Sequence, residues 1–322
     1  MSSYDRFEYL EIGDRQPVTA QPPEPILDAS SVLVKDDERL PGTKLVVDQI
    51  IGRRGTAAGE FNCPAGVDVD DKGNLYVADS YNHRLQRITP DGKVTVIGGK
   101  GTVAGCFLNP QDIVVDHQSC IYVLEQGNNR IQKIDSEGCL QLLIGRHGDR
   151  PGQFNSPMGL SIDRSGCIFI ADTGNNRLQK LSALGFPVFV TNPRTSPRLF
   201  SPQGVDLTHD GHCYVADTFA HCIVEFDANG HEIRRFGRQG SAHGEFDEPQ
   251  DLAVDKDGRL FVIEMANNRL QVFGDEHGCL ACFESSPAVG RLSSPTGIAV
   301  GPSGEVYISD TMNHRILRAV WK

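Results

Sequence analysis

The chain has 322 residues, of which 39% are hydrophobic and 23% charged, as in an ordinary globular protein. Its formal net charge of −11 argues against a protein that binds nucleic acid, because such proteins carry a basic surface. No apolar run approaches the roughly 18 residues that cross a membrane, and no signal peptide is visible. We therefore expect a cytoplasmic protein whose nine cysteines are reduced.

Residues 1–42 form the first segment and differ in composition from the rest of the chain. They hold five prolines, nine acidic and four basic residues, and no repeated motif. A segment of this composition buries too little apolar surface to fold by itself. We expect a flexible acidic tail, with a short docking segment at residues 4–12 as the alternative.

From residue 43 onward the sequence is typical of strands. Residues 43–52, TKLVVDQIIG, predict one strand. Six similar units follow, each aligned on a proline and spaced 45 to 47 residues apart. The aligned prolines are Pro64, Pro110, Pro157, Pro202, Pro249 and Pro295.

Each unit predicts four short antiparallel strands. In the first unit GVDVD is followed by the turn DDKGN, then by LYVAD, RLQRI and KVTVIGG. Four such strands in about 46 residues make one propeller blade. Six blades bury their faces by closing into a ring, so the predicted fold is an all-β, six-bladed β-propeller spanning residues 43–322.

The two ends of the repeat region predict how the ring closes. The sixth unit has room for three strands before the chain ends at Lys322. We expect the strand at residues 43–52 to supply the fourth, which removes a free sheet edge.

The motif F-x-x-P-x-G followed by G-x-L-Y-V-A-D-S-x-N-H-R-L-Q resembles the NHL repeat, and the resemblance covers all six units. It implies a six-bladed β-propeller. It implies little about chemistry, because the family includes binding scaffolds, RNA binders, kinase sensor domains and a few lyases.

An acidic residue lies fifteen positions after each proline, and five of the six units have an arginine five positions later. An acid at one register in every blade is typical of a scaffold, so we expect these residues to pair structurally. The acids are Asp79, Glu125, Asp172, Asp217, Glu264 and Asp310.

Three histidines share the position nineteen residues after the proline: His83, His221 and His314. The resemblance offers a zinc site, since inward histidines hold zinc in the peptidyl-hydroxyglycine amidating lyases. We favour a structural role, because His is the consensus residue at this position of the repeat.

Blades 2 and 5, which face each other across a six-fold ring, depart from the repeat. Two residues after the proline they have Asp112 and Asp251, where the other four blades have glycine, and their strand-two acids are Glu125 and Glu264. If Asp112 lies opposite Val123, the period of two puts Asp112 and Glu125 on one face, whereas a slip of one residue separates them.

Two carboxylates about 5 Å apart repel by roughly 3 kcal/mol at an effective dielectric near 20. Either Arg130 and Arg269 relieve this repulsion, or the pairs form a site for a cation or a cationic ligand group. Gln111, Gln203 and Gln250 follow the proline and could add polar contacts there. The predicted ligand-binding residues are Asp112, Glu125, Asp251, Glu264, Gln111 and Gln250.

The cysteines give no strong metal signal. Cys279 and Cys282 form one C-x-x-C near His277, but alternation along a strand puts the two thiols on opposite faces, and a zinc site needs four ligands.

The predicted function is that of a cytoplasmic, monomeric and non-enzymatic scaffold that binds a protein or small ligand at the rim of the channel mouth. No known catalytic motif is present. The alternatives are a metal-dependent lyase or hydrolase that uses a divalent cation in the channel, and an RNA-binding propeller, which the net charge disfavours.

Overall fold

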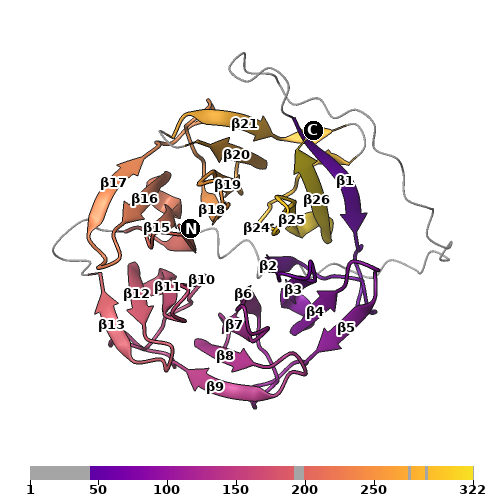
Figure 1. The fold of residues 1–322 in the computed structure, drawn as a ribbon, viewed down its shortest axis with the longest axis vertical. Coiled ribbons are helices and arrows are strands. Elements are labelled where there is room, and N and C mark those ends of the chain that lie inside the picture. Colours follow the sequence, from indigo (N-terminus) through magenta and orange to yellow (C-terminus); the bar gives the residue numbers. More distant parts are fainter. Residues whose placement is uncertain (1–43, 192–198, 275–276, 287–288, 322) are drawn as a thin grey trace, which may run out of the picture.

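The computed structural model describes residues 44–191, 199–274, 277–286 and 289–321. The predicted tail, residues 1–42, lies outside these ranges. The described chain forms six four-stranded antiparallel sheets arranged as blades around a central axis (Figure 1). The fold prediction is therefore confirmed.

The blades follow one another in chain order, each running from its innermost to its outermost strand (Figure 1). Blade 1 is β2 (Pro64–Val69), β3 (Leu75–Asp79), β4 (Arg84–Ile88) and β5 (Val94–Ile97); blade 2 is β6 (Pro110–Val115), β7 (Ile121–Glu125), β8 (Arg130–Ile134) and β9 (Leu140–Ile144); blade 3 is β10 (Gly159–Ile162), β11 (Ile168–Asp172), β12 (Arg177–Leu181) and β13 (Pro187–Val190).

The second half of the ring repeats this order. Blade 4 is β14 (Pro202–Leu207), β15 (Cys213–Asp217), β16 (Cys222–Phe226) and β17 (Glu232–Phe236); blade 5 is β18 (Pro249–Val254), β19 (Leu260–Glu264), β20 (Arg269–Phe273) and β21 (Cys279–Phe283); blade 6 is β24 (Gly297–Val300), β25 (Val306–Asp310), β26 (Arg315–Trp321) and β1 (Leu45–Ile51). The minor elements are the two-residue strands β22 (Ser285–Ser286) and β23 (Gly290–Arg291) and the 3-10 turns η1 (Ser80–Asn82), η2 (Thr173–Asn175), η3 (Thr218–Ala220) and η4 (Thr311–Asn313).

The ring closes as predicted. Strand β1 pairs antiparallel with β26, from Leu45 opposite Trp321 to Ile51 opposite Ile316. The first described strand therefore completes the last blade, and the ends of the propeller are joined by backbone hydrogen bonds rather than by an open edge.

The hydrophobic core lies between blades. One cluster joins Tyr76 and Leu85 of blade 1 to Ile113 and Val123 of blade 2. Each of four inter-blade loops contains one fully buried phenylalanine, which we call the wedge phenylalanine. These residues are Phe61, Phe107, Phe154 and Phe246. Each blade thus depends on its neighbours for burial, as expected of a closed repeat.

The shared histidine position ties each blade to the next. Nδ1 of His83 accepts the backbone N–H of Asn109 at 3.1 Å, and Nδ1 of His314 accepts that of Cys63 at 3.0 Å. In blade 2 the Oδ1 of Asn129 accepts the N–H of Ser156 in the same way. These residues also adopt positive φ, near 50°, which Asn and His tolerate better than most residues. The position therefore requires a side-chain acceptor, and the structural interpretation of the histidines is supported.

No helix in the part of the chain that the structure describes is long and apolar enough to cross a membrane.

Candidate functional site

The innermost strands of the six blades lie nearest the central axis (Figure 1), and residues of all six line a central channel. It contains a hollow of about 120 Å³, lined by Asp68, Asp112, Asp206 and Asp251 together with Ser161 and apolar residues. Among the described lining residues of the hollow and its mouth there is no lysine, arginine or histidine. The described lining of the channel is therefore acidic and contributes no basic side chain.

Each aspartate caps the inner strand of the following blade. Oδ2 of Asp112 accepts the backbone N–H of Leu160 at 2.7 Å, and Oδ2 of Asp251 accepts that of Ile298 at 3.0 Å. Asp68 and Asp206 make the equivalent bonds to Val115 at 2.6 Å and Val254 at 2.8 Å. The inner strands have no neighbouring strand on the channel side, so these carboxylates satisfy N–H groups that would otherwise lack a partner.

Four of the six blades have glycine at the position of Asp112 and Asp251, for a steric reason. A Cβ on Gly66 would lie 2.4 Å from Oδ1 of Asp112, and a Cβ on Gly204 would lie 2.6 Å from the Cα of Asp251. A Cβ on Gly159 would lie 1.9 Å from the carbonyl oxygen of Gln203. The glycines thus allow the inner strands to approach closely enough for an aspartate to reach the next blade.

The expected pairing of Asp112 with Glu125 on one face is wrong. Asp112 lies opposite Leu124 rather than Val123, because a bulge between Pro110 and Asp112 shifts the register by one residue. The same bulge follows Pro249 in blade 5, where Asp251 lies opposite Ile263. The aspartates therefore face the channel, whereas the glutamates face away from it.

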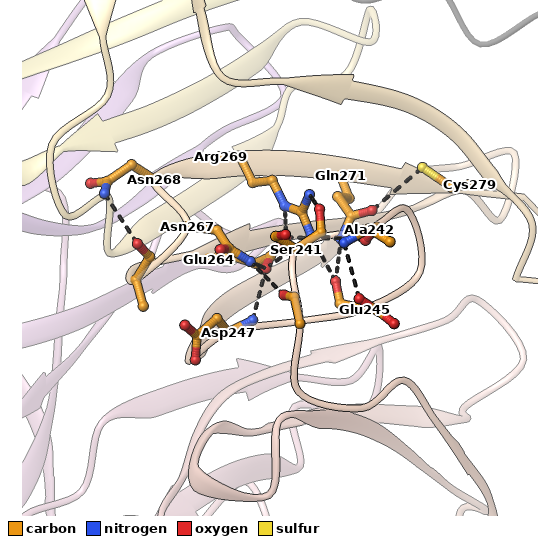
Figure 2. A network of polar contacts seen from close by, with 12 residues as sticks. Ser241, Ala242, Glu245, Asp247, Glu264, Asn267, Asn268, Arg269, Gln271 and Cys279 are labelled. Atoms are coloured by element: carbon orange, nitrogen blue, oxygen red, sulfur yellow. Dashed lines mark hydrogen bonds and ion pairs between the residues drawn. The ribbon is translucent and has the colours of Figure 1, made fainter.

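Figure 2 shows where Glu264 lies instead. Its carboxylate accepts hydrogen bonds from Arg269 Nε at 2.5 Å, Asn267 Nδ2 at 2.6 Å and Gln271 Nε2 at 2.8 Å. Its Oε2 also accepts the N–H of Asp247, in the loop that enters the blade, at 2.9 Å. The guanidinium of Arg269 then donates to the loop carbonyls of Ser241, Ala242 and Glu245.

Blade 2 repeats this network with Glu125, Asn128, Arg130 and Gln132. Blades 1, 3 and 6 have the same pairing of acid and arginine, with an Nε–carboxylate distance of 2.6 to 2.7 Å. The strand-two acid is thus a structural partner of the arginine, as the repeat predicted. Glu125 and Glu264 belong to this scaffold and lie away from the channel.

The mouth of the channel lies at the beginnings of the inner strands. It is narrow and lined by Gln111, Gln203, Gln250, Met158 and Thr296, beside Asp112 and Asp251. Nε2 of Gln250 donates to Oε1 of Gln203. Oε1 of Gln250 has no hydrogen-bond partner within the described chain, although the residue is only 6% exposed. The mouth thus presents an unused acceptor next to two carboxylates.

The channel carboxyls have raised pKa values. Each aspartate is partly exposed to the channel but surrounded by protein on its other sides. Burial raises the pKa of Asp68 and of Asp251 to about 7, and it raises that of Asp206. Burial and then the charge of Asp251 raise the pKa of Asp112 well above its usual range. A cation in the channel would favour the ionised carboxylates.

Sequence reasoning missed Asp68 and Asp206. Both lie four residues after the proline, in blades 1 and 4, where the other blades have Val, Ser or Ala. Alternation puts this position on the same face as the position two residues after the proline. The signal was therefore present, but it required knowing which face borders the channel.

In the parts of the chain that the structure describes, no group of three or more His, Cys, Asp and Glu side chains is arranged to hold a metal ion. No disulfide joins the nine cysteines, all of which lie in described segments. Cys279 Sγ is 3.5 Å from Oε1 of Gln271, in the network of blade 5.

Comparison with known proteins agrees with the fold. The family model described as the NHL repeat matches residues 61–88, 246–273 and 292–318. A gluconolactonase from Xanthomonas campestris is 18% identical with a TM-score of 0.69, and the match covers 94% of this chain and 99% of that one. Virginiamycin B lyase from Staphylococcus aureus is 14% identical with a TM-score of 0.60, over 86% and 99% of the two chains.

A protein of unknown function from Bacteroides thetaiotaomicron is also similar, with 15% identity, a TM-score of 0.70, and coverage of 87% of this chain and 76% of that chain. At these identities the structural similarity shows the fold and does not extend to the activities of the two enzymes.

Proposed function

Since this chain is a six-bladed β-propeller and the NHL-repeat model matches three of its blades, we propose that it is a binding protein whose ligand presents a compact cationic group to the mouth of the channel. The binding residues in this proposal are Asp112, Asp251, Gln111 and Gln250. Glu125 and Glu264 are left out because their carboxylates are used by Arg130 and Arg269.

The observation that carries the proposal is the unpartnered Oε1 of Gln250, buried beside two carboxylates. A buried polar atom without a hydrogen bond costs free energy, and a donor or cation at the mouth would remove that cost. The same cation would favour the ionised forms of Asp112 and Asp251, whose pKa values are raised and which have no basic neighbour among the described lining residues. A metal ion and an ammonium group share this chemistry.

The test is native mass spectrometry of dialysed protein, after treatment with a chelator, titrated with calcium, magnesium or methylammonium chloride. We expect one cation per chain. The double variant Asp112→Asn/Asp251→Asn should bind at least about tenfold more weakly, since it removes both charges and keeps the side-chain shape. Asp257→Asn is the matched control, because Asp257 lies on an exposed turn and pairs with Lys256; its affinity should be unchanged.

Three outcomes decide between the candidates. Retention of an amine in competition with metals supports the binding protein. Tight retention of one divalent ion with no effect of the amine favours the alternative of a metal-dependent lyase or hydrolase. If the protein retains none of the three cations, the proposal is wrong and the channel aspartates act only as caps of the inner strands.

We place this binding protein in the cytoplasm. The nine cysteines form no disulfide, which fits a reducing compartment.

A further inference from the structure

The loops that enter consecutive blades carry a second feature, outside the channel. In four of them the residue ten positions before the proline forms an isolated parallel bridge with the wedge phenylalanine, so these positions are structurally equivalent. The four residues are Arg54, Lys100, His147 and Gln239. All are exposed. Blades 1, 2 and 3 therefore present a basic side chain at the same place, whereas blade 5 presents an amide.

Two of these cations lie near a histidine of the preceding blade. The charge of Arg54 acts on His314 and the charge of Lys100 acts on His83, in each case adding to burial to lower the pKa of the imidazole. Both histidines are tied by Nδ1 to a backbone N–H of the loop. Each junction thus joins one histidine and one cation at the end of the propeller where the inner strands begin.

The hydrogen bonds accepted by Nδ1 of the two histidines determine which ring nitrogen can donate to a ligand. A neutral imidazole that accepts at Nδ1 must carry its hydrogen on Nε2. His83 and His314 therefore have an Nε2–H left to donate, beside the ammonium of Lys100 and the guanidinium of Arg54. This part of the rim presents donors and positive charge, so it is complementary to carboxylates.

The charge balance of the loops supports this interpretation. The loops at residues 52–62, 98–108 and 145–156 contain five arginines and lysines and two acids. One of the acids, Glu60, is paired with Arg53 at 3.0 Å. The equivalent loop of blade 5, residues 237–248, contains one arginine and three acids. In a chain of net charge −11, the rim over blades 1–3 is thus a local basic surface.

We propose that this basic arc, defined by Arg54, Lys100, His147, His83 and His314, binds an acidic peptide segment of a partner protein. An extended peptide rises about 3.3 Å per residue, so carboxylates spaced along it can meet successive blades. A longer polyanion such as RNA is less favoured than a short acidic segment, because its phosphates continue beyond the arc onto a protein whose net charge is −11. The arc is separate from the proposed channel site and does not depend on it.

The test is fluorescence anisotropy with a labelled 15-residue peptide that has glutamate at every third position and serine elsewhere. We expect binding at 50 mM salt that weakens as salt is raised. The double variant Arg54→Gln/Lys100→Gln should bind at least about tenfold more weakly. The matched control is Lys72→Gln/Lys256→Gln, which removes the same charge from exposed turns between the first two strands of blades 1 and 5; its affinity should change less than about twofold.

A second variant tests the equivalence of the positions. Gln239→Lys extends the arc toward blade 5 and should strengthen peptide binding. Equal weakening by the two double variants, or no binding of the peptide, would overturn the proposal. So would tighter binding of a 15-nucleotide single-stranded RNA that is lost in the same Arg54→Gln/Lys100→Gln variant, since the arc would then be a nucleic-acid surface.

Discussion

Blades 4 and 5 are neighbours with the same arrangement of four strands, yet the buried acid at the end of the second strand has different partners in the two blades. In blade 5, Glu264 receives hydrogen bonds from Asn267, Arg269 and Gln271 (Figure 2). In blade 4 these three positions are Ala220, Cys222 and Val224. Asp217 is left with the backbone N–H of Phe200 at 2.5 Å, and its Oδ2 has no hydrogen bond within the described chain. The nearest cation is Arg235 on the outermost strand, at 3.5 Å.

The comparison shows which contact of the acid is common to the repeat. In all six blades the carboxylate accepts a backbone N–H seventeen residues earlier in the chain, from the loop that enters the blade. The bonds to Asn, Arg and Gln are additional and are absent from blade 4. The primary role of the acid is therefore to hold the inter-blade loop, and the arginine compensates its charge.

The largest expected effect comes from breaking the network of blade 5. Glu264→Ala leaves the guanidinium of Arg269, whose side chain is 3% exposed, without its counter-charge. We expect a loss of about 3–5 kcal/mol in the free energy of unfolding, measured by urea denaturation. Glu60→Ala is the control, because Glu60 pairs with an arginine that is 63% exposed, and it should cost far less stability. Equal costs would show that the buried pair has no special role.

The pH dependence of stability should further distinguish the buried acid of blade 4 from that of blade 5. Burial raises the pKa of Asp217 from 3.8 to about 6. The folded state then binds the proton more tightly than the unfolded state, so the contribution of Asp217 is fully present below about pH 4 and is lost as the pH rises through 6. Asp217→Asn should gain roughly 2–3 kcal/mol relative to the natural chain between pH 4.5 and pH 7.5.

The measurement is urea denaturation of both proteins at several pH values in that range. A constant difference between them would mean that Arg235 neutralises Asp217 as completely as Arg269 neutralises Glu264.

The smallest effect is expected at the position nineteen residues after the proline, which is histidine in three blades and asparagine in the other three. His83→Asn keeps a side-chain acceptor for the N–H of Asn109 and a residue that tolerates positive φ, as Asn129 does in blade 2. At pH 7.5 the melting temperature should change by less than about 2 °C. Burial lowers the pKa of His83, so the contribution of the neutral ring is present above the ordinary histidine value and is lost as the pH falls through the lowered one.

An asparagine side chain does not titrate, so His83→Asn should lose less stability than the natural chain between pH 7 and pH 5. His209→Asn, on an exposed turn, is the control. A variant that melts several degrees lower at pH 7.5 would show that the imidazole makes a contact that asparagine cannot replace.

Much of the fold could be predicted because its signals are local. The proline spacing, the alternation within strands and the unpaired strand before the first unit together predicted six blades and their closure, and β1 pairs with β26 accordingly. The structural role of the repeated acids also followed, since an identical residue in every blade is a scaffold property.

The candidate site could be predicted only in part. Asp112 and Asp251 were selected because they interrupt a row of glycines, and both border the channel. Glu125 and Glu264 were selected by the same logic, but one bulged residue after the proline moves them to the opposite face. A bulge of this kind depends on the fit of neighbouring blades, which the pattern of one strand does not contain.

By itself the sequence determined the strands, the number of blades and the way the ring closes, because these depend on periodicity and on repeat spacing along the chain. The tertiary structure alone decided the register of the inner strands, the meeting of Asp68, Asp112, Asp206 and Asp251 in one channel, and the basic arc on its rim. Those features join residues from different blades, and only the closed ring brings the blades within reach of one another.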